Sequence, residues 1–277
     1  MSFMDLHLHT RHSDGSDTPA QVVARAAALG MSALAITDHD TVSGVEEACG
    51  AAVDAGIAFL TGTEISTRFR RSEIHVTGLG IDPTDEELLR ALDGLKTGRA
   101  TRAARIMELL HTAGIPIEPE RVRGRTADGL VGRMHVASEL RDMGVTKTVQ
   151  EGFDRFLNSG RPAFVPKVAL PVLEAIEWIH GAGGLAFVAH PGLSKSSRRL
   201  LSALLALPFD GIEAYHISHS PGRTAEFVQL AQSRGLLVAG GSDCHGTVKR
   251  VAEMGKVRVP LEHLAAIQAA LESRGRG

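Results

Sequence analysis

Histidines and acidic residues recur in short clusters along this chain, each beside a segment with the character of a β-strand. The clusters are Asp5-Leu6-His7-Leu8-His9, Asp14, Asp38-His39, Glu64, His75, His190 and Asp243-Cys244-His245. Imidazole and carboxylate groups are the ligands that borderline divalent ions such as Zn²⁺, Mn²⁺ and Fe²⁺ prefer. One such pair would mean little. A series that closes successive strands predicts a fold that gathers these side chains into one pocket for several metal ions.

The spacing inside the clusters supports metal binding. Residues i and i+2 of a strand face the same side, so His7 and His9 are expected to point into one interior, and Asp243 and His245 share this spacing. Glu64 follows a turn-like segment, 61–63, and is expected at a strand end. A carboxylate there is best explained as a bridge between two cations, because an unpaired buried charge is costly.

Ordinary structural roles could explain each residue taken singly. His7 or His9 alone could be a hydrogen-bonded core histidine, His75 could face solvent, and His190 could end a strand before a proline. These explanations would all have to hold together while every residue falls at the same end of the fold, so the metal pocket is favoured. His12 is left open. Three further histidines lie on expected helices and are not expected to be ligands: His111, His180 and His263.

Short apolar runs alternate with helical segments over most of the chain. Strands are expected at 4–9, 33–36, 57–60, 74–79, 184–188, 211–214 and 236–239. Thr18-Pro19 begins a helix that Gly30 closes, and Ser43 begins another that ends near Gly56. This alternation predicts an α/β fold, a distorted seven-stranded (β/α) barrel, TIM-like, with parallel strands and its chemistry at their carboxyl ends.

One stretch breaks the alternation with helical periodicity and no convincing strand. Its expected helices are 86–95, 99–113, 133–143 and 146–157. We therefore expect a first barrel part at 1–83, a helical insertion at 84–163 covering the mouth of the site, and a second barrel part at 164–277. The insertion is rich in arginine, and ordinary solvated surface charge is the favoured explanation for most of it.

Composition and charge exclude several classes of protein. The 277 residues suffice for one large core with a modest insertion, and 43% apolar and 22% charged residues are ordinary for a globular protein. A net charge of −2 creates no global attraction to nucleic acid or anionic membrane. Two cysteines give no disulfide framework, and no apolar run reaches the roughly 18 residues that a membrane span needs. The ligand cluster that starts at Asp5 leaves no room for the apolar core of a signal peptide. A cytoplasmic protein is therefore expected.

The ordered motifs resemble those of the PHP (polymerase and histidinol phosphatase) family over essentially the whole chain. They are Asp5-Leu6-His7-Leu8-His9-Thr10, Ile36-Thr37-Asp38-His39-Asp40, Gly62-Thr63-Glu64, Glu73-Ile74-His75, Ala189-His190-Pro191 and Gly241-Ser242-Asp243-Cys244-His245-Gly246. Segments 131–135 and 153–157 resemble the branch of 3′,5′-nucleoside bisphosphate phosphatases, some of whose relatives trim RNA 5′ ends. Met134 stands where that branch leads us to expect proline, and Cys244 where an aromatic residue is usual.

The resemblance implies a PHP-type barrel that holds two or three divalent metal ions, Mn²⁺, Fe²⁺ or Zn²⁺. It implies these ligand sets: His7, His9, Glu64 and Asp243 for a first ion; Glu64, His75 and His190 for a second; Asp14, His39 and His245 for a third. Asp14 replaces a histidine of some relatives, which leaves occupancy of the third position open and could favour Mn²⁺ or Fe²⁺ over Zn²⁺.

The chemistry implied by such a centre is hydrolysis of a phosphate ester. Two cations about 3.5–4 Å apart make a bound hydroxide available at neutral pH and neutralise phosphate oxygens. The favoured substrate is a phosphomonoester of a small nucleotide, above all a 3′,5′-nucleoside bisphosphate. His190 and His245 are candidate proton donors to the leaving group. The candidate phosphate contacts are Arg133, Lys167 and His219.

Several alternatives stay open. They are a phosphodiesterase or 5′-3′ exoribonuclease acting on short RNA or a cyclic phosphate, a histidinol-phosphate phosphatase, and a non-catalytic metal-binding domain. The complete ligand set argues against the last. One Trp and one Tyr offer no obvious platform for stacking several bases, which favours a mononucleotide. No required protein partner and no membrane contact are expected.

Overall fold

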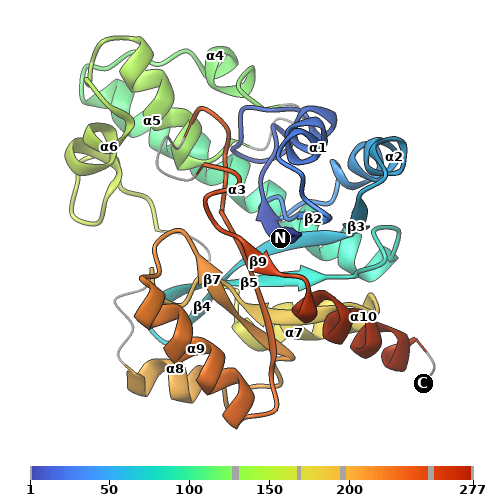
Figure 1. The fold of residues 1–277 in the computed structure, drawn as a ribbon. Coiled ribbons are helices and arrows are strands. Elements are labelled where there is room, and N and C mark those ends of the chain that lie inside the picture. The colour runs from blue at the N-terminus through green and yellow to red at the C-terminus, as the bar shows by residue number, and fades with distance from the viewer. Residues whose placement is uncertain (1, 127–130, 167–169, 194–197, 249–252, 276–277) are drawn as a thin grey trace.

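Two β-sheets form the frame of the protein in this computed structural model, which describes residues 2–126, 131–166, 170–193, 198–248 and 253–275 (Figure 1). The first sheet has the order β3-β2-β1-β9 and contains β1 (Phe3–Leu8), β2 (Ala33–Ile36), β3 (Ala58–Leu60) and β9 (Val259–Pro260). The second has the order β4-β5-β6-β7-β8 and contains β4 (Gly62–Phe69), β5 (Ser72–Leu79), β6 (Leu185–Val188), β7 (Gly211–His216) and β8 (Leu237–Gly241).

The seven expected strands are all present, but a closed seven-stranded barrel is not confirmed. Among the described residues neither sheet closes on itself, and β4 and β9 were not expected. Isolated bridges join the sheets where Leu8 pairs with Cys244 and His39 with Glu64. The fold is therefore a mixed α/β architecture whose two sheets meet beside the histidine clusters.

The pairing of β4 with β5 shows why the all-parallel expectation was wrong. Only Arg70 and Arg71 separate these strands, and a two-residue connection makes an antiparallel hairpin because a parallel pair needs a long crossover. Arg70 has a φ of 56°, as the tight hairpin turn requires. The pairs β5 with β6 and β1 with β9 are also antiparallel, whereas β1-β2, β2-β3, β6-β7 and β7-β8 are parallel.

Helices cover the outer faces of the sheets. On the first sheet, α1 (Pro19–Ala28) begins at a capping box made by Thr18, as expected, and α2 (Val45–Ala55) follows Gly44 and ends at the left-handed Gly56. The second sheet packs against α7 (Val172–Gly181) and α9 (Pro221–Ser233). The remaining helices of this part are α8 (Arg198–Leu204) and α10 (Glu262–Arg274). Across the described residues, no helix combines the length and apolarity that crossing a bilayer would need.

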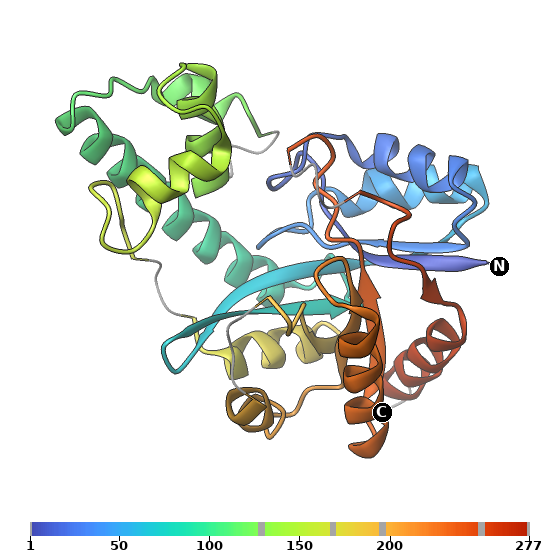
Figure 2. The ribbon, with the colours of Figure 1, turned by 60° about the vertical axis from the view of Figure 1, so that its left-hand side comes forward.

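A group of helices between β5 and β6 stands apart from the sheets (Figure 2). Its first helix, α3 (Glu86–Thr112), is continuous over 27 residues where two helices were expected. The others are α4 (Pro119–Arg123), α5 (Arg133–Asp142), α6 (Val149–Gly152) and the π-helical turn η1 (Phe153–Leu157). Leu88 and Leu92 of α3 pack in the core of the second sheet, whereas Ala103 to Leu110 pack in a separate core with α5 and η1. One helix thus ties this group to the sheets.

Candidate metal centre

The expected ligands come together where the two sheets meet. Their ligand atoms form four overlapping groups, each within 4.8 Å: His9, Asp14, His39 and His245; His7, Glu64 and His190; His7, His9 and Asp243; His39, Glu64 and His75. The groups share members, so the side chains form one continuous cluster. The division of these residues among individual ions stays a prediction.

Glu64 occupies the middle of the cluster and is fully buried. Five imidazoles surround its carboxylate: His7, His9, His39, His75 and His190. Its Oε1 lies 2.8 Å from Nδ1 of His75 and 2.7 Å from Nε2 of His190. Its Oε2 lies 3.0 Å from Nδ1 of His39. Glu64 was expected at a strand end, but it is the third residue of β4 and lies opposite Thr77 of β5.

Two aspartates complete the cluster on its other side. Asp243 Oδ1 lies 3.1 Å from Nε2 of His9, and Asp14 Oδ1 lies 3.1 Å from Nε2 of His245. Asp243 and His190 both have positive φ values, 54° and 27°, which L-residues rarely adopt. Such strain costs about 1–3 kcal/mol per residue and persists where the surrounding structure enforces it, commonly at functional sites.

The donor set fits divalent cations. Nε2 of His7 and Nε2 of His9 approach to 3.1 Å, and both lie within 3.3 Å of Oε2 of Glu64. Oε2 of Glu64 lies close to several imidazole nitrogens, but neither it nor Nδ1 of His9 makes a hydrogen bond of ordinary geometry among the described residues. Buried polar atoms without partners are costly, and a cation accepting both nitrogen and oxygen donors would satisfy them.

The cluster attracts positive charge strongly. Burial disfavours the charged form of His7, but Glu213 and Glu64 outweigh it and raise the pKa of His7 well above its usual value. Burial likewise opposes protonation of His9, but Asp243 and Glu64 raise its pKa to about 9. Metal ligands must be deprotonated, so protons and divalent cations compete for this cluster.

Glu213 is a site residue that sequence reasoning missed. Its buried carboxylate accepts hydrogen bonds at 2.7 Å from Nδ1 of His7 and at 2.7 Å from Oγ1 of Thr77, and at 2.8 Å from the backbone N–H of His190. Burial disfavours its ionised form, but His7 outweighs burial and lowers its pKa to about 2. The available signal was a carboxylate inside an otherwise apolar strand, Gly211-Ile212-Glu213-Ala214.

His216 is a second residue that was missed, although it lies only two residues after the expected strand 211–214. Its side chain is buried, and Nε2 lies 3.6 Å from Oδ2 of Asp243. Nδ1 accepts a hydrogen bond from the backbone N–H of Ser218 at 3.1 Å, so in the neutral ring the proton resides on Nε2. His216 therefore presents a donor to the edge of the cluster.

Two buried aspartates support the loops that carry the ligands. Asp38 accepts hydrogen bonds from the backbone N–H of Thr10 at 2.8 Å and from the hydroxyl of Ser13 at 2.5 Å, which fixes the loop before Asp14. Asp5 accepts one from the backbone N–H of Ser242 at 3.0 Å, next to Asp243. These carboxylates lie in the ligand motifs but position the loops, so the motifs encode both the ligands and their supports.

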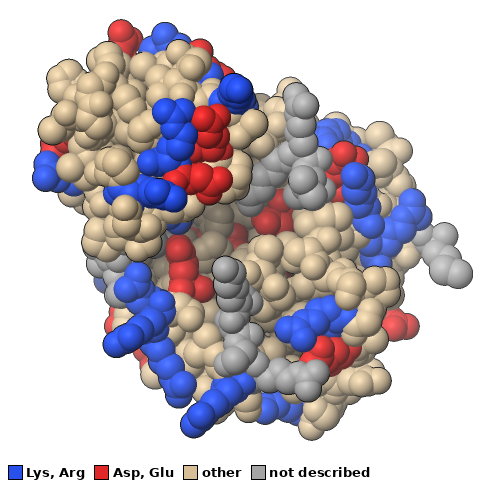
Figure 3. Space-filling view, turned by 90° about the vertical axis from the view of Figure 1, so that its left-hand side faces the viewer, with Lys and Arg blue, Asp and Glu red and all other residues tan. Residues whose placement is uncertain are grey.

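Arg133 lines a pocket beside the cluster. The pocket is also lined by Arg99, Arg102, Asp14, His39 and His75. Arg133 NH2 lies 3.8 Å from Oε2 of Glu73, and its guanidinium lies over the ring of Phe153. A hollow between the helical group and the sheets contains acidic atoms and has basic side chains around its edges (Figure 3).

The other two expected phosphate contacts have different outcomes. Lys167 lies outside the described residues. His219 accepts a hydrogen bond from the backbone N–H of Gly192 at 3.0 Å, and its Nδ1 donates to the carbonyl of Ala214 at 2.8 Å. Burial lowers its pKa to about 4. Because main-chain groups engage both nitrogens, His219 fastens the loop after β6 to β7 and leaves neither nitrogen available to a phosphate oxygen.

Comparisons with known proteins agree with this geometry. The profile of the PHP domain matches residues 5–155. A 3′,5′-nucleoside bisphosphate phosphatase of Chromobacterium violaceum is 38% identical over 250 residues, 88% of each chain. A 5′-3′ exoribonuclease of Haemophilus influenzae is 37% identical over 245 residues, 87% of this chain and 89% of its own. A solved structure from Bifidobacterium adolescentis, provisionally assigned as a metal-dependent phosphoesterase, has a TM-score of 0.89 at 30% identity and covers 98% of this chain and 96% of its own.

Proposed function

This chain belongs to the PHP domain family, and from that membership we propose that it is a metal-dependent phosphatase of small nucleotides. The favoured substrate is a 3′,5′-nucleoside bisphosphate, the substrate class in the name of the relative from Chromobacterium violaceum. The observation that carries the proposal is one fully buried carboxylate, that of Glu64, which is enclosed by five imidazoles beside an arginine-lined pocket.

Two or three divalent ions, Mn²⁺, Fe²⁺ or Zn²⁺, would be held by the residues of the cluster. The proposed ligands are His7, His9, Asp14, His39, Glu64, His75, His190, Asp243 and His245. When bound, such ions lower the pKa of a water molecule and neutralise charge on phosphoryl oxygens. The two free cysteines, Cys49 and Cys244, suit a reducing compartment, so we place the activity in the cytoplasm.

The arginine pocket supports a substrate with a second phosphate. Arg102 donates to the carbonyl of Val165 at 2.8 Å, and burial together with the charge of Arg133 lowers its pKa to about 10. Arg99 is committed to Asp40 and to Ser66, at 3.1 Å from the Ser66 hydroxyl. A bound phosphate would relieve the repulsion between Arg102 and Arg133, and guanidinium groups bind phosphate through paired hydrogen bonds.

A hydrogen bond to the leaving oxygen is better suited to His216 than to the two histidines first considered as proton donors. Nε2 of His190 faces Glu64 and Nε2 of His245 faces Asp14, which are positions for metal ligands. A nitrogen that holds a cation has no proton to give. In the neutral ring of His216 the Nε2–H lies at the edge of the cluster, 3.6 Å from Oδ2 of Asp243, where it would donate a hydrogen bond to the leaving oxygen.

A 5′-3′ exoribonuclease is the second candidate function. It is favoured by the relative of that name in Haemophilus influenzae, at 37% identity. The same metal centre would serve both reactions, because each hydrolyses a phosphate ester. The scarcity of aromatic residues, with one Trp and one Tyr in the chain, still favours the smaller substrate.

The test combines metal analysis with a phosphate-release screen. Purified protein is assayed by mass spectrometry for bound transition metals, and then with nucleoside mono- and bisphosphates, cyclic phosphates, histidinol phosphate and short 5′-phosphorylated RNA. We expect bound metal and the highest kcat/KM with a 3′,5′-bisphosphate. An RNA preference above about tenfold in kcat/KM would reverse the ranking. Absence of both metal and hydrolysis would refute the proposal.

A further inference from the structure

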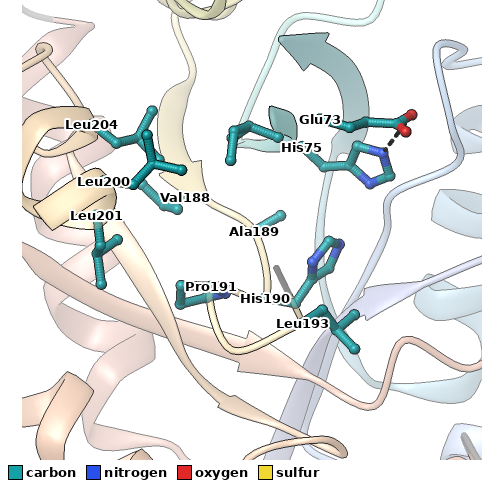
Figure 4. A pocket seen from close by; sticks show the side chains of 11 residues that line it. Glu73, His75, Val188, Ala189, His190, Pro191, Leu193, Leu200, Leu201 and Leu204 are labelled. Atoms are coloured by element: carbon teal, nitrogen blue, oxygen red, sulfur yellow. Dashed lines mark ion pairs between the residues drawn. The ribbon is translucent and has the colours of Figure 1, made fainter. Parts of the chain in front are cut away.

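An apolar pocket of about 200 Å³ adjoins the metal cluster on the side of β6. It shares His75 and His190 with the cluster (Figure 4). The rest of its wall is mostly aliphatic and includes Val188, Ala189, Pro191, Leu193, Leu200 and Leu201. Among their lining residues, this pocket and the arginine pocket share only Glu73 and His75. Two chemically different pockets therefore adjoin the same cluster.

The pocket lies between α8 and two histidines of the cluster. Leucines of α8 lie on one side and the imidazoles of His75 and His190 on the other (Figure 4). Leu193, three residues after His190, is 52% exposed although it is aliphatic. An exposed aliphatic side chain on the rim of a concave apolar site is surface that a bound ligand would cover.

We propose that this pocket binds the base of the nucleotide substrate, an inference that rests on the proposed function. An apolar cavity of about 150 Å³ accommodates benzene, so this one has room for a heterocyclic ring. Ribose hydroxyls and phosphates would lose hydrogen bonds against aliphatic walls, whereas the faces of a base are apolar. The base is therefore the part of a nucleotide that suits the pocket.

The position of the pocket agrees with this assignment. A phosphate bound at the metal cluster would lie beside His75 and His190, and the same two residues line the apolar pocket. The arginine pocket also adjoins the cluster, through Asp14, His39 and His75, and a second phosphate would bind there. One nucleoside bisphosphate could thus occupy the cluster and both pockets together.

Aliphatic walls recognise the size of a ring and not its hydrogen-bonding pattern. A hydrophobic pocket discriminates poorly between ligands of similar shape, whereas a site with paired polar groups rejects mismatched ligands strongly. The pocket should therefore increase the affinity for any nucleotide over a substrate without a base, with little preference among the bases.

The test compares adenosine 3′,5′-bisphosphate with its abasic analogue, tetrahydrofuran 3′,5′-bisphosphate, using the metal-loaded enzyme. The variants are Leu193→Ser and Leu200→Ser, and the control is Leu29→Ser, a leucine of similar exposure to Leu193 at the end of α1. We expect the wild type to prefer the nucleotide and each pocket variant to reduce the ratio of the two kcat/KM values by about tenfold. Leu29→Ser should preserve the ratio. Thermal unfolding of each variant checks that it is folded.

The outcomes separate this inference from the proposed function. If the wild type hydrolyses both substrates equally, or if the ratio survives both pocket substitutions, the pocket does not bind the base, and the phosphatase activity stands. If the wild type with bound metal hydrolyses neither substrate, the proposed function fails, and the assignment of the pocket fails with it.

Discussion

Oε1 of Glu213 lies 2.7 Å from Nδ1 of His7, and both side chains are buried. A carboxylate at that distance accepts a hydrogen bond from Nδ1–H and thereby fixes the tautomer of the ring. Nε2 is then the atom that faces the cluster, 3.2 Å from Oε2 of Glu64. Carboxylates that hold the second nitrogen of a metal-binding histidine orient the ring and raise its basicity.

Replacing Glu213 by Gln should weaken metal binding by roughly 10- to 100-fold, because the amide holds His7 less firmly and removes a charge. Competition with a chromogenic chelator measures the change, and activity should recover when the metal concentration is raised. Thr77→Val is the control, since it removes a different partner of Glu213 and keeps the bond to His7. Wild-type metal affinity in Glu213→Gln would contradict this positioning role.

Replacing Glu64 by Gln tests whether one carboxylate joins the metal sites. The substitution keeps the shape but removes the charge that five imidazoles share. We expect at least one equivalent of metal to be lost and kcat to fall by at least about 100-fold. Metal content and kcat are measured on the same samples. Glu174→Gln, on the exposed face of α7, should change neither, and unaltered metal content in Glu64→Gln would exclude a bridging role.

Replacing Arg133 by Ala tests the contact with the second phosphate. The KM for a 3′,5′-bisphosphate should rise about tenfold because a guanidinium–phosphate pair is lost, whereas the KM for a simple monoester should change little. Arg123→Ala, on α4, is the matched control. Among the ion pairs of the described residues, Arg123 has one, with Glu120 at the surface. Equal changes for both substrates would remove Arg133 from the proposed binding of the second phosphate.

Local sequence signals were sufficient to predict most elements and the position of the cluster. The helix after Thr18-Pro19 forms where its cap predicts it, because capping depends only on neighbouring residues. His7 and His9 come together with Asp243 and His245 as their spacing and strand-end positions predicted. These features are encoded within a few residues of each motif.

The features that were missed depend on contacts between distant segments. Thr61-Gly62-Thr63 resembles a turn, yet β4 begins at Gly62 because its backbone pairs with Leu79 of β5. Glu213 looks misplaced in an apolar strand until the fold brings His7, 206 residues away in sequence, against it. His219 was expected to bind phosphate, but the fold places Gly192 and Ala214 against its two nitrogens. Strand pairing and side-chain partners of this kind are not visible in one sequence.

Asp210 should make stability depend on pH independently of the metal centre. It accepts hydrogen bonds at 2.7 Å from His180 and from the backbone N–H of Ala186, and at 2.6 Å from Arg274. Burial favours its neutral form, but these partners outweigh burial and lower its pKa below 3.8. The stabilisation by ionised Asp210 is therefore complete above the pKa of this carboxyl in the unfolded chain. It is lost as the pH falls through the lower pKa of the same carboxyl in the folded protein.

Asp210→Asn should reduce the free energy of unfolding by about 1–3 kcal/mol at pH 7, and the difference in this free energy between variant and wild type should narrow below about pH 4. Urea unfolding at both pH values measures it, with the exposed Asp54→Asn as control. A difference that stays constant with pH would show that ionised Asp210 does not stabilise the fold, because titration of the metal cluster is common to both proteins and cancels.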